Sequence, residues 1–138
     1  MTGKLSDWAK EFLRGDHFAV LSTLNKDGSS QLTTMWYALE NDGTIVMSTP
    51  SHLQKVKNLR RDPRIAICVP DGNRYVSLSG TVTIIEDQII VRRDIERLVE
   101  RYVQDEAARP QTIETLVQQT RVSLRFTPEK VTEFSVST

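Results

Sequence analysis

Residues 18–49, FAVLSTLNKDGSSQLTTMWYALENDGTIVMST, decide the fold of this chain. Runs rich in apolar and β-branched residues are separated there by two clusters of Asn, Asp and Gly, at 25–28 and 41–43. Such runs favour strands, and such clusters favour the tight turns of hairpins. The pattern therefore predicts an antiparallel meander of three strands, at 17–24, 29–40 and 44–49.

Short helices are expected on both sides of this meander. Apolar residues recur at spacings of three and four between Leu5 and Leu13, and Ser6 precedes them as an N-cap. After the meander, Pro50 breaks the third strand, and a helix is predicted over 51–62 with Ser51 as its N-cap. The sequence thus places a helix directly after the third strand.

The rest of the chain alternates between strands and helices without the strict βα repeat of a parallel sheet. Strands are predicted at 64–69 and 74–85 with a bend at Gly80, helices at 91–103 and 112–119, and a final strand pair within 122–136. Segment 18–21 is apolar on both faces, so it needs cover on both sides. We therefore expect one α+β domain spanning 1–138, a partly open antiparallel barrel with peripheral helices and a second subunit as the missing cover.

Composition restricts the class of partner. Lys and Arg together number 18, as do Asp and Glu, so no net field draws the chain toward nucleic acid or anionic lipid. The lone Cys68 lies in an apolar run and has no partner for an internal disulfide, which suits a reducing compartment. No stretch is apolar enough to span a bilayer. We expect a cytoplasmic protein without nucleic-acid or membrane partners.

A local excess of positive charge follows the third strand. Residues 49–64 hold five Lys or Arg against one Asp, and helical geometry puts Lys55 and Asn58 opposite the apolar side. Hydroxyl groups and the free amides of a helix start stand just before them, at Ser48, Thr49 and Ser51. Hydroxyls, amides and a lysine suit a phosphate monoester. The alternative is a solvated basic helix face.

A second candidate is the strand segment 31–37. Alternation places Thr33, Met35 and Tyr37 on one face and Leu32, Thr34 and Trp36 on the other. Neighbouring threonines and an aromatic residue suit the polar rim of a planar heterocycle. On this segment alone, however, an ordinary β-branched and aromatic strand is the simpler interpretation.

Several familiar sites are missing from the sequence. The only histidines, His17 and His52, have no metal-ligand spacing, so no metal site is predicted. The glycine-rich nucleotide loops are also missing. No catalytic residue is identified: Tyr37 and Tyr75 are proton donors in principle, but structural roles are favoured for both.

Three segments together resemble a known family. Residues 18–49, the helix end NLRRDPR at 58–64 and the strand YVSLSGTVTI at 75–84 are similar to the pyridoxamine 5′-phosphate oxidase-like split-barrel proteins. Within that family the resemblance is closest to members that use the deazaflavin coenzyme F-420. It implies an antiparallel split β-barrel of the FMN-binding type, and a homodimer with the cofactor at the subunit interface.

The resemblance also implies a set of cofactor-binding residues. The cofactor ring would lie along the second strand, and its phosphate would be held where the third strand meets the next helix. The matched positions are Thr33, Thr34, Met35 and Trp36 for the ring, and Ser48, Thr49, Ser51, Lys55, Asn58 and Arg60 for the phosphate. The chain departs from many relatives at His52 and Leu53, where a basic residue commonly follows the serine.

The function implied is hydride transfer between coenzyme F-420 and a small conjugated organic substrate. One alternative is an FMN-binding oxidoreductase on the same fold, and another is a non-catalytic cofactor or haem carrier. Oxidation of pyridoxamine phosphate itself is disfavoured, because Arg121 and Arg125 alternate with apolar residues as a strand would and offer no evident second phosphate grip.

Overall fold

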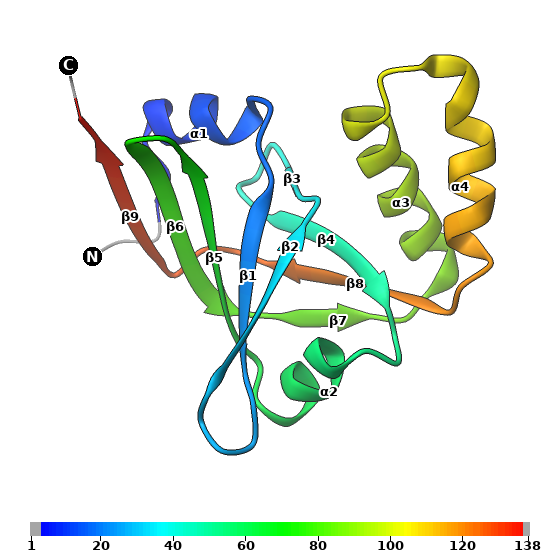
Figure 1. The fold of residues 1–138 in the computed structure, drawn as a ribbon, viewed down its shortest axis with the longest axis horizontal. Coiled ribbons are helices and arrows are strands. Elements are labelled where there is room, and N and C mark those ends of the chain that lie inside the picture. Colours follow the sequence, from blue (N-terminus) through cyan, green and yellow to red (C-terminus); the bar gives the residue numbers. More distant parts are fainter. Residues whose placement is uncertain (1–3, 137–138) are drawn as a thin grey trace.

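The chain forms two antiparallel sheets that fold into a split barrel, in a computed structural model that describes residues 4–136 (Figure 1). The strands within those residues are β1 (Ala19–Leu24), β2 (Ser30–Met35), β3 (Ala38–Leu39), β4 (Ile45–Pro50), β5 (Arg64–Asp71), β6 (Arg74–Thr81), β7 (Thr83–Ile85), β8 (Arg121–Phe126) and β9 (Lys130–Ser135). One sheet has the order β2-β1-β5-β6-β9, and the other β3-β4-β8-β7. The predicted fold class, α+β with antiparallel strands, is confirmed; the ends of the predicted domain 1–138 lie outside the described residues.

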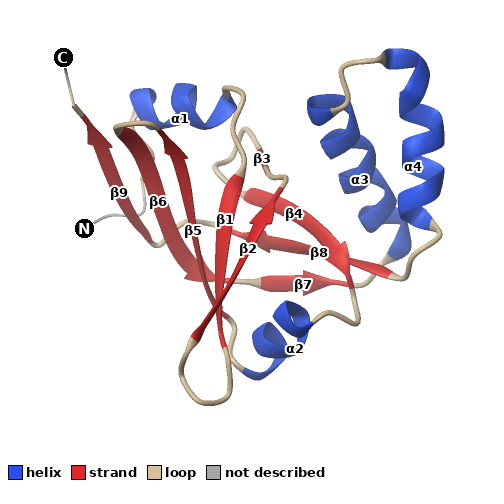
Figure 2. Ribbon diagram, in the orientation of Figure 1, coloured by secondary structure: helices blue, strands red, loops and turns tan. Residues whose placement is uncertain are grey.

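Helices lie against parts of the outside of the barrel (Figure 2). They are α1 (Asp7–Arg14), α2 (Gln54–Arg61), α3 (Gln88–Tyr102), the short 3-10 turn η1 (Glu106–Ala108) and α4 (Arg109–Val117). Helix α3 packs on β4 and β8, α2 packs on β1, and α4 packs on α3 (Figure 1). No described helix has the length and apolar character needed to cross a membrane.

Two strands that the sequence predicts as continuous are divided in the structure. Segment 29–40 breaks at Trp36 and Tyr37, so that β2 joins one sheet and β3 the other. Segment 74–85 breaks at Val82 in the same way, two residues after the bend expected at Gly80. Gly80 has a different role, because a Cβ there would lie 2.9 Å from the carbonyl oxygen of Thr127. Both breaks pass the chain from one sheet to the other.

The predicted caps and helix ends are only partly correct. The side chain of Ser6 accepts a hydrogen bond from the amide of Ala9, as expected of an N-cap. Ser51 does not cap α2: Leu53 occupies the N-cap position without a side-chain bond, and the amide of Ser51 donates to the carbonyl of Thr120 at 2.8 Å. The chain needs three more residues after Pro50 to turn from β4 into α2.

The later helices begin earlier than their apolar periodicity indicates. Helix α3 begins at Gln88, where the carboxylate of Asp87 accepts hydrogen bonds from the amides of Ile89 and Ile90. Helix α4 runs from Arg109 to Val117 rather than over 112–119. The first turn of α3 does contain Ile89 and Ile90, but Ile89 is 82% exposed, and the buried apolar stripe that marks the helix begins only at Val91.

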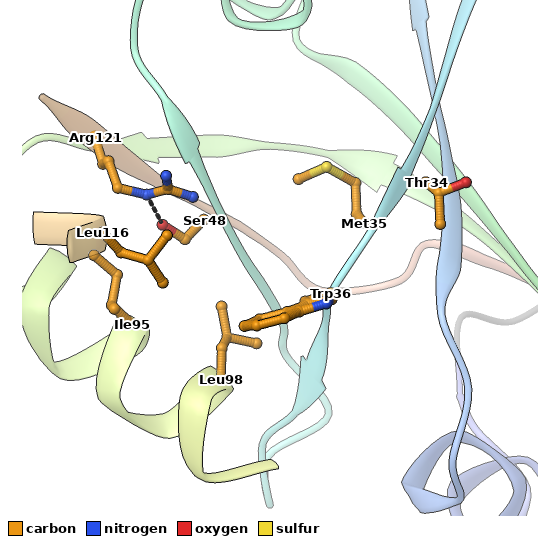
Figure 3. A pocket seen from close by; sticks show the side chains of 8 residues that line it. All are labelled: Thr34, Met35, Trp36, Ser48, Ile95, Leu98, Leu116 and Arg121. Carbon is orange, nitrogen blue, oxygen red and sulfur yellow. Dashed lines mark hydrogen bonds between the residues drawn. The ribbon is translucent and has the colours of Figure 1, made fainter. Parts of the chain in front are cut away.

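Buried apolar side chains form two clusters. The larger fills the barrel and includes Leu21, Met35 and Leu78, and the smaller joins Ile95 and its neighbours on α3 to Trp36 and α4. The adjacent residues Met35 and Trp36 thus belong to different clusters. A cavity between the barrel and the helices is lined by both of them (Figure 3).

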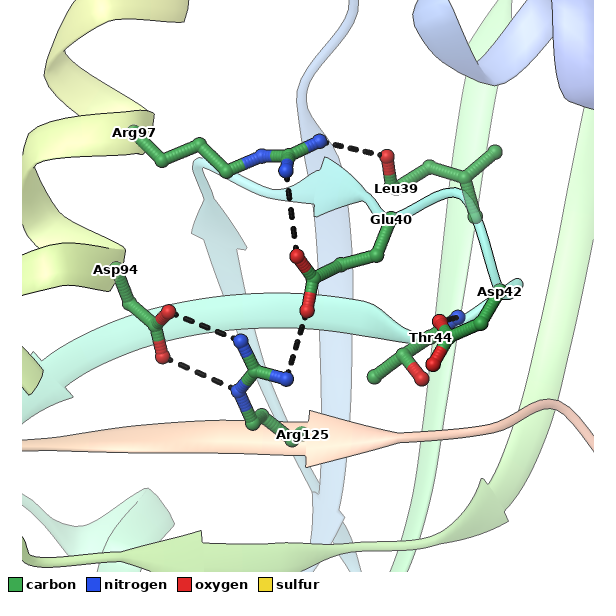
Figure 4. A network of polar contacts seen from close by, with 7 residues as sticks. All are labelled: Leu39, Glu40, Asp42, Thr44, Asp94, Arg97 and Arg125. Carbon is green, nitrogen blue, oxygen red and sulfur yellow. Dashed lines mark hydrogen bonds and ion pairs between the residues drawn. The ribbon is translucent and has the colours of Figure 1, made fainter. Parts of the chain in front are cut away.

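A charged network fixes α3 to the second sheet (Figure 4). Arg125 of β8 donates from two nitrogens to the carboxylate of Asp94, at 3.0 and 3.2 Å, and the Asp94 side chain is only 3% exposed. Arg125 also contacts Glu40 at 2.7 Å, and Glu40 in turn pairs with Arg97 of α3. The hydrogen bond that Arg125 donates to Asp94, above all, raises the pKa of Arg125, so the guanidinium remains charged.

We predict that replacing Asp94 by Ala lowers the free energy of unfolding by about 3 kcal/mol, because Arg125 is left partly buried without its bidentate partner. The matched control is Glu86→Ala, which breaks the exposed pair between Glu86 and Arg60. That change should cost less than about 1 kcal/mol. Urea unfolding of the variants measures both values, and equal losses would contradict a structural role for the network.

Candidate anion and cofactor site

A cavity of about 210 Å³ lies between the end of β2 and the α3–α4 helices (Figure 3). Its polar part consists of Ser48 and Arg121, which lie beside the apolar side chains that α3 and α4 contribute (Figure 3). The residues that line it are Thr34, Met35, Trp36, Ser48, Ile95, Leu98, Leu116 and Arg121. Such a cavity suits a molecule that has an anionic end and an apolar body.

Strand geometry places the polar part of the cavity. Along β4, alternation turns Ser48 toward the cavity while Met47 and Thr49 point into the barrel. Strand β8 pairs with β4 so that Arg121 lies opposite Pro50, two residues along from Ser48 and on the same face. Nε of Arg121 donates to Oγ of Ser48 at 3.0 Å. Two segments about 70 residues apart in sequence therefore build this part together.

Two cations, Lys55 and Arg121, lie near enough for the charge of one to act on the other, and neither pairs with an acidic side chain among the described residues. Lys55 is 7% exposed, and among the described residues its ammonium has one hydrogen-bond partner, the thioether sulfur of Met35 at 3.4 Å. Besides Ser48, Arg121 contacts the side chain of Gln119. Within residues 4–136, neither cation forms an ion pair with a carboxylate. A thioether sulfur is a weak hydrogen-bond acceptor. The N–H groups of the Lys55 ammonium therefore remain able to donate hydrogen bonds to an anion.

Burial of the positive charges of Lys55 and Arg121 is unfavourable for folding. Burial lowers the pKa of the Lys55 ammonium below its ordinary value, and the nearby charge of Arg121 lowers it further. Burial also lowers the pKa of Arg121. An anion placed between these groups would offset both effects, because an opposite charge favours the protonated forms. The cation pair and the hydroxyl of Ser48 therefore fit a phosphate group.

Four of the ten predicted site residues line this cavity, namely Thr34, Met35, Trp36 and Ser48. Lys55 is not part of the lining, but its ammonium donates to the sulfur of Met35, which is. Three others lie outside its lining: Thr33 and Ser51 are half-buried, and Thr49 is 1% exposed. The hydroxyl of Thr49 donates weakly to the carbonyl of Pro50 at 3.4 Å. For these three residues, cofactor contact stays a prediction.

Asn58 and Arg60 are engaged in other contacts. Asn58 is fully buried, and its amide nitrogen donates to Oγ1 of Thr23 at 3.1 Å and to Oδ1 of Asn25 at 2.9 Å. These bonds tie α2 to the hairpin that follows β1. Arg60 is exposed and pairs with Glu86 at 3.3 Å. The helix face that carries Lys55 and Asn58 is thus buried rather than solvated, and a cofactor role for Asn58 and Arg60 stays a prediction.

Sequence reasoning did not assign Arg121 or the apolar wall of Ile95, Leu98 and Leu116 to this site. The sequence does contain a signal for Arg121. On β8, Arg121 and Ser123 alternate with the apolar residues Val122 and Leu124, which are buried in the barrel. Polar side chains on the outer face of such a strand need partners wherever helices cover that face.

Tyr37 has a structural role in this arrangement. Its hydroxyl is buried and donates to the carbonyl of Leu13 at 2.6 Å. Burial raises its pKa well above the ordinary value. A phenol held in this way is not available to donate a proton at the cavity.

Comparison with known proteins shows the family of the chain. The family model of pyridoxamine 5′-phosphate oxidase matches residues 5–135. The chain therefore belongs to the pyridoxamine 5′-phosphate oxidase family, as its strand and helix motifs indicated.

Individual relatives span most of the chain. An F420H(2)-dependent biliverdin reductase from Mycobacterium tuberculosis is 31% identical over 102 residues, which cover 73% of this chain and 74% of the relative. A conserved hypothetical protein from the same organism has a solved structure with a TM-score of 0.82 and 28% identity, covering 96% of this chain and 86% of that one. The haem storage protein HutZ from Vibrio cholerae has a TM-score of 0.73 and 17% identity, with 95% of each chain covered.

We predict that Lys55→Met raises the free energy of unfolding at pH 7 by about 0.5 kcal/mol or more, a size typical of single stabilising substitutions. Because the pKa of Lys55 is lowered on folding, the charged lysine opposes folding at neutral pH. That penalty disappears as pH rises from the lowered pKa toward the ordinary value near 10.5, so the advantage of methionine should shrink there.

Lys57→Met is the matched control, since Lys57 is an exposed lysine on the same helix. Chemical denaturation at several pH values measures the effect. A Lys55→Met protein that is less stable than the parent at pH 7 would contradict the proposal that the buried charge of Lys55 opposes folding.

Proposed function

We propose that the chain is an oxidoreductase that binds deazaflavin coenzyme F-420 and transfers a hydride to a small conjugated organic substrate. The observation that supports a phosphate-bearing cofactor is a pair of neighbouring cations that form no ion pair within residues 4–136: Arg121, hydrogen-bonded to Ser48 in the lining of the cavity, and Lys55, in contact with Met35. The similarity to a mycobacterial reductase named for F420H(2) supports the choice of cofactor.

The described residues fit the parts of such a cofactor. Lys55, Arg121 and Ser48 would hold the phosphate, and the strand end at Thr34 and Trp36 would lie along the ring. When bound, the deazaflavin ring supplies the hydride, and a proton completes the reduction of one conjugated double bond. The protein orients the ring, and the apolar wall keeps water from it.

FMN is the second candidate, and the charge of the site favours it specifically. A phosphate monoester carries nearly two negative charges at neutral pH, whereas the phosphodiester of coenzyme F-420 carries one. Two cations with no acidic partner match the monoester more closely. A haem-carrier role has weaker support, because the likeness to HutZ at 17% identity concerns the fold alone.

A homodimer belongs to the proposal. Cavities that enclose a small-molecule ligand usually measure about 300–1,000 Å³, and a cavity of about 210 Å³ is below that range. On the outer face of β1, β5 and β6, one row across the sheet consists of the half-buried, uncharged residues Val20, Cys68 and Ser77. A second copy on this face would bury it, and that partner would help to enclose the cofactor.

Binding is tested by fluorescence titration of the two cofactors. The chain has two tryptophans, so a Trp8→Phe background leaves Trp36, which lines the cavity, as the only tryptophan reporter. We expect saturable quenching, weakened roughly 10- to 100-fold by Lys55→Met, because a hydrogen bond to a charged group is worth about 1.5–3 kcal/mol.

Lys57→Met in the same background should bind like the parent protein. The proposal fails if neither cofactor binds, or if the Lys55→Met and Lys57→Met variants bind equally well. Binding of FMN alone would reverse the order of the two candidates.

A further inference from the structure

The side-chain amide of Asn58 is the centre of a hydrogen-bond network on the inner side of α2. Its nitrogen donates to Oγ1 of Thr23 at 3.1 Å and to Oδ1 of Asn25 at 2.9 Å. Its oxygen accepts from Nε2 of Gln54 at 2.9 Å and from the guanidinium of Arg61 at 3.3 Å. Gln54 and Arg61 are the first and last residues of α2. The network therefore joins the whole helix to the end of β1 and the turn that follows it.

Few other contacts hold α2 in place. The helix has 8 residues, and Leu53 at its N-cap position makes no side-chain hydrogen bond. Its buried apolar side chains are those of Val56 and Leu59. A helix of this length is unstable by itself and takes its position from tertiary contacts. The hydrogen bonds of Asn58 are thus a main link between α2 and the β1–β2 hairpin.

Lys55 lies three residues before Asn58, on the same face of α2. Its ammonium donates to the sulfur of Met35 on β2 at 3.4 Å, and Met35 lines the cavity. Burial lowers the pKa of Lys55, so the charged side chain is more stable in water. A lysine has a long flexible stem and reaches water when its helix is free to shift. Fixing α2 against the hairpin prevents that shift.

We propose that Asn58 is a positioning residue for Lys55: it locks α2 to the end of β1 and thereby holds the Lys55 ammonium where a cofactor phosphate binds. The proposal rests on the proposed function, because the phosphate belongs to that cofactor. It requires no contact between Asn58 and the cofactor. A buried amide that is hydrogen-bonded through both its nitrogen and its oxygen is favourable, and it offsets the unfavourable burial of the lysine.

A double-mutant cycle on stability tests this coupling without a cofactor. Lys55→Met should stabilise the parent protein at pH 7, because the buried charge opposes folding. In an Asn58→Ala background the lysine is free to reach water, so the same substitution should give little or no gain. Urea unfolding of the parent, both single variants and the double variant measures the coupling. The proposal is overturned if Lys55→Met stabilises both backgrounds equally, or if it does not stabilise the parent.

Cofactor binding tests the role of Asn58 in the site. FMN and riboflavin differ only by the phosphate, so the ratio of their affinities isolates the phosphate contact. In the Trp8→Phe background, Asn58→Ala should lower the preference for FMN over riboflavin about 3- to 30-fold, with riboflavin affinity unchanged. In a protein that already carries Lys55→Met, Asn58→Ala should not lower this preference further. For coenzyme F-420, the same comparison uses the deazaflavin that lacks the phosphate-bearing chain.

Two further variants control for loss of folding and of buried hydrogen bonds. Thr23→Val keeps the shape of the side chain but removes one acceptor of Asn58, so both effects should appear in the same direction and be smaller. This variant carries both tests where Asn58→Ala does not fold. Tyr37→Phe removes a buried hydrogen bond to the carbonyl of Leu13, away from α2, and should leave the FMN preference unchanged. A loss of preference in Tyr37→Phe as large as in Asn58→Ala overturns the proposal.

The two experiments separate this proposal from the proposed function. Cofactor binding with an FMN preference that Asn58→Ala does not change rejects the positioning role alone. Coupling between Asn58 and Lys55 in the stability cycle, in a protein that binds neither cofactor, supports the positioning of Lys55 and rejects the redox assignment.

Discussion

The arrangement on which the site depends is a pair of neighbouring cations, Lys55 and Arg121, that no carboxylate among residues 4–136 neutralises. Lys55 is almost entirely buried, and its pKa is lowered first by that burial and then by Arg121. Charges in such a position oppose folding unless a ligand compensates them. Four separate elements converge to create it: β2 contributes Met35, β4 contributes Ser48, α2 contributes Lys55 and β8 contributes Arg121. Convergence of that kind is typical of a ligand-binding site rather than of a stabilising contact.

Much of the fold could be predicted because its signals are local. The turns at 25–28 and 41–43 mark the meander, and the serine before α1 marks its start. The divisions at Trp36–Tyr37 and at Val82 could not be predicted in the same way, since they depend on which sheet each half of the strand joins. Sheet membership is set by contacts between distant segments, as in the pairing of β7 with β8.

In the candidate site, too, the residues that are close in sequence could be predicted together, and those that are distant in sequence could not. Ser48 and Lys55 belong to one continuous segment, so the hydroxyls and the basic helix start could be associated directly from the sequence. Arg121 joins them only through the register of β4 and β8, across 73 residues. Asn58 was grouped with Lys55 because both lie opposite the apolar side of α2, a side that is usually solvated. Here β1 and the hairpin that follows it cover that side, and their Thr23 and Asn25 side chains accept hydrogen bonds from the amide of Asn58.

The most direct test of the central claim is a crystal structure of the protein grown with coenzyme F-420 or FMN. The account predicts the cofactor phosphate within hydrogen-bonding distance, about 2.7–3.2 Å, of Nζ of Lys55 and of the guanidinium of Arg121. A bound cofactor whose phosphate lies elsewhere, with Lys55 still in contact only with Met35, would contradict it.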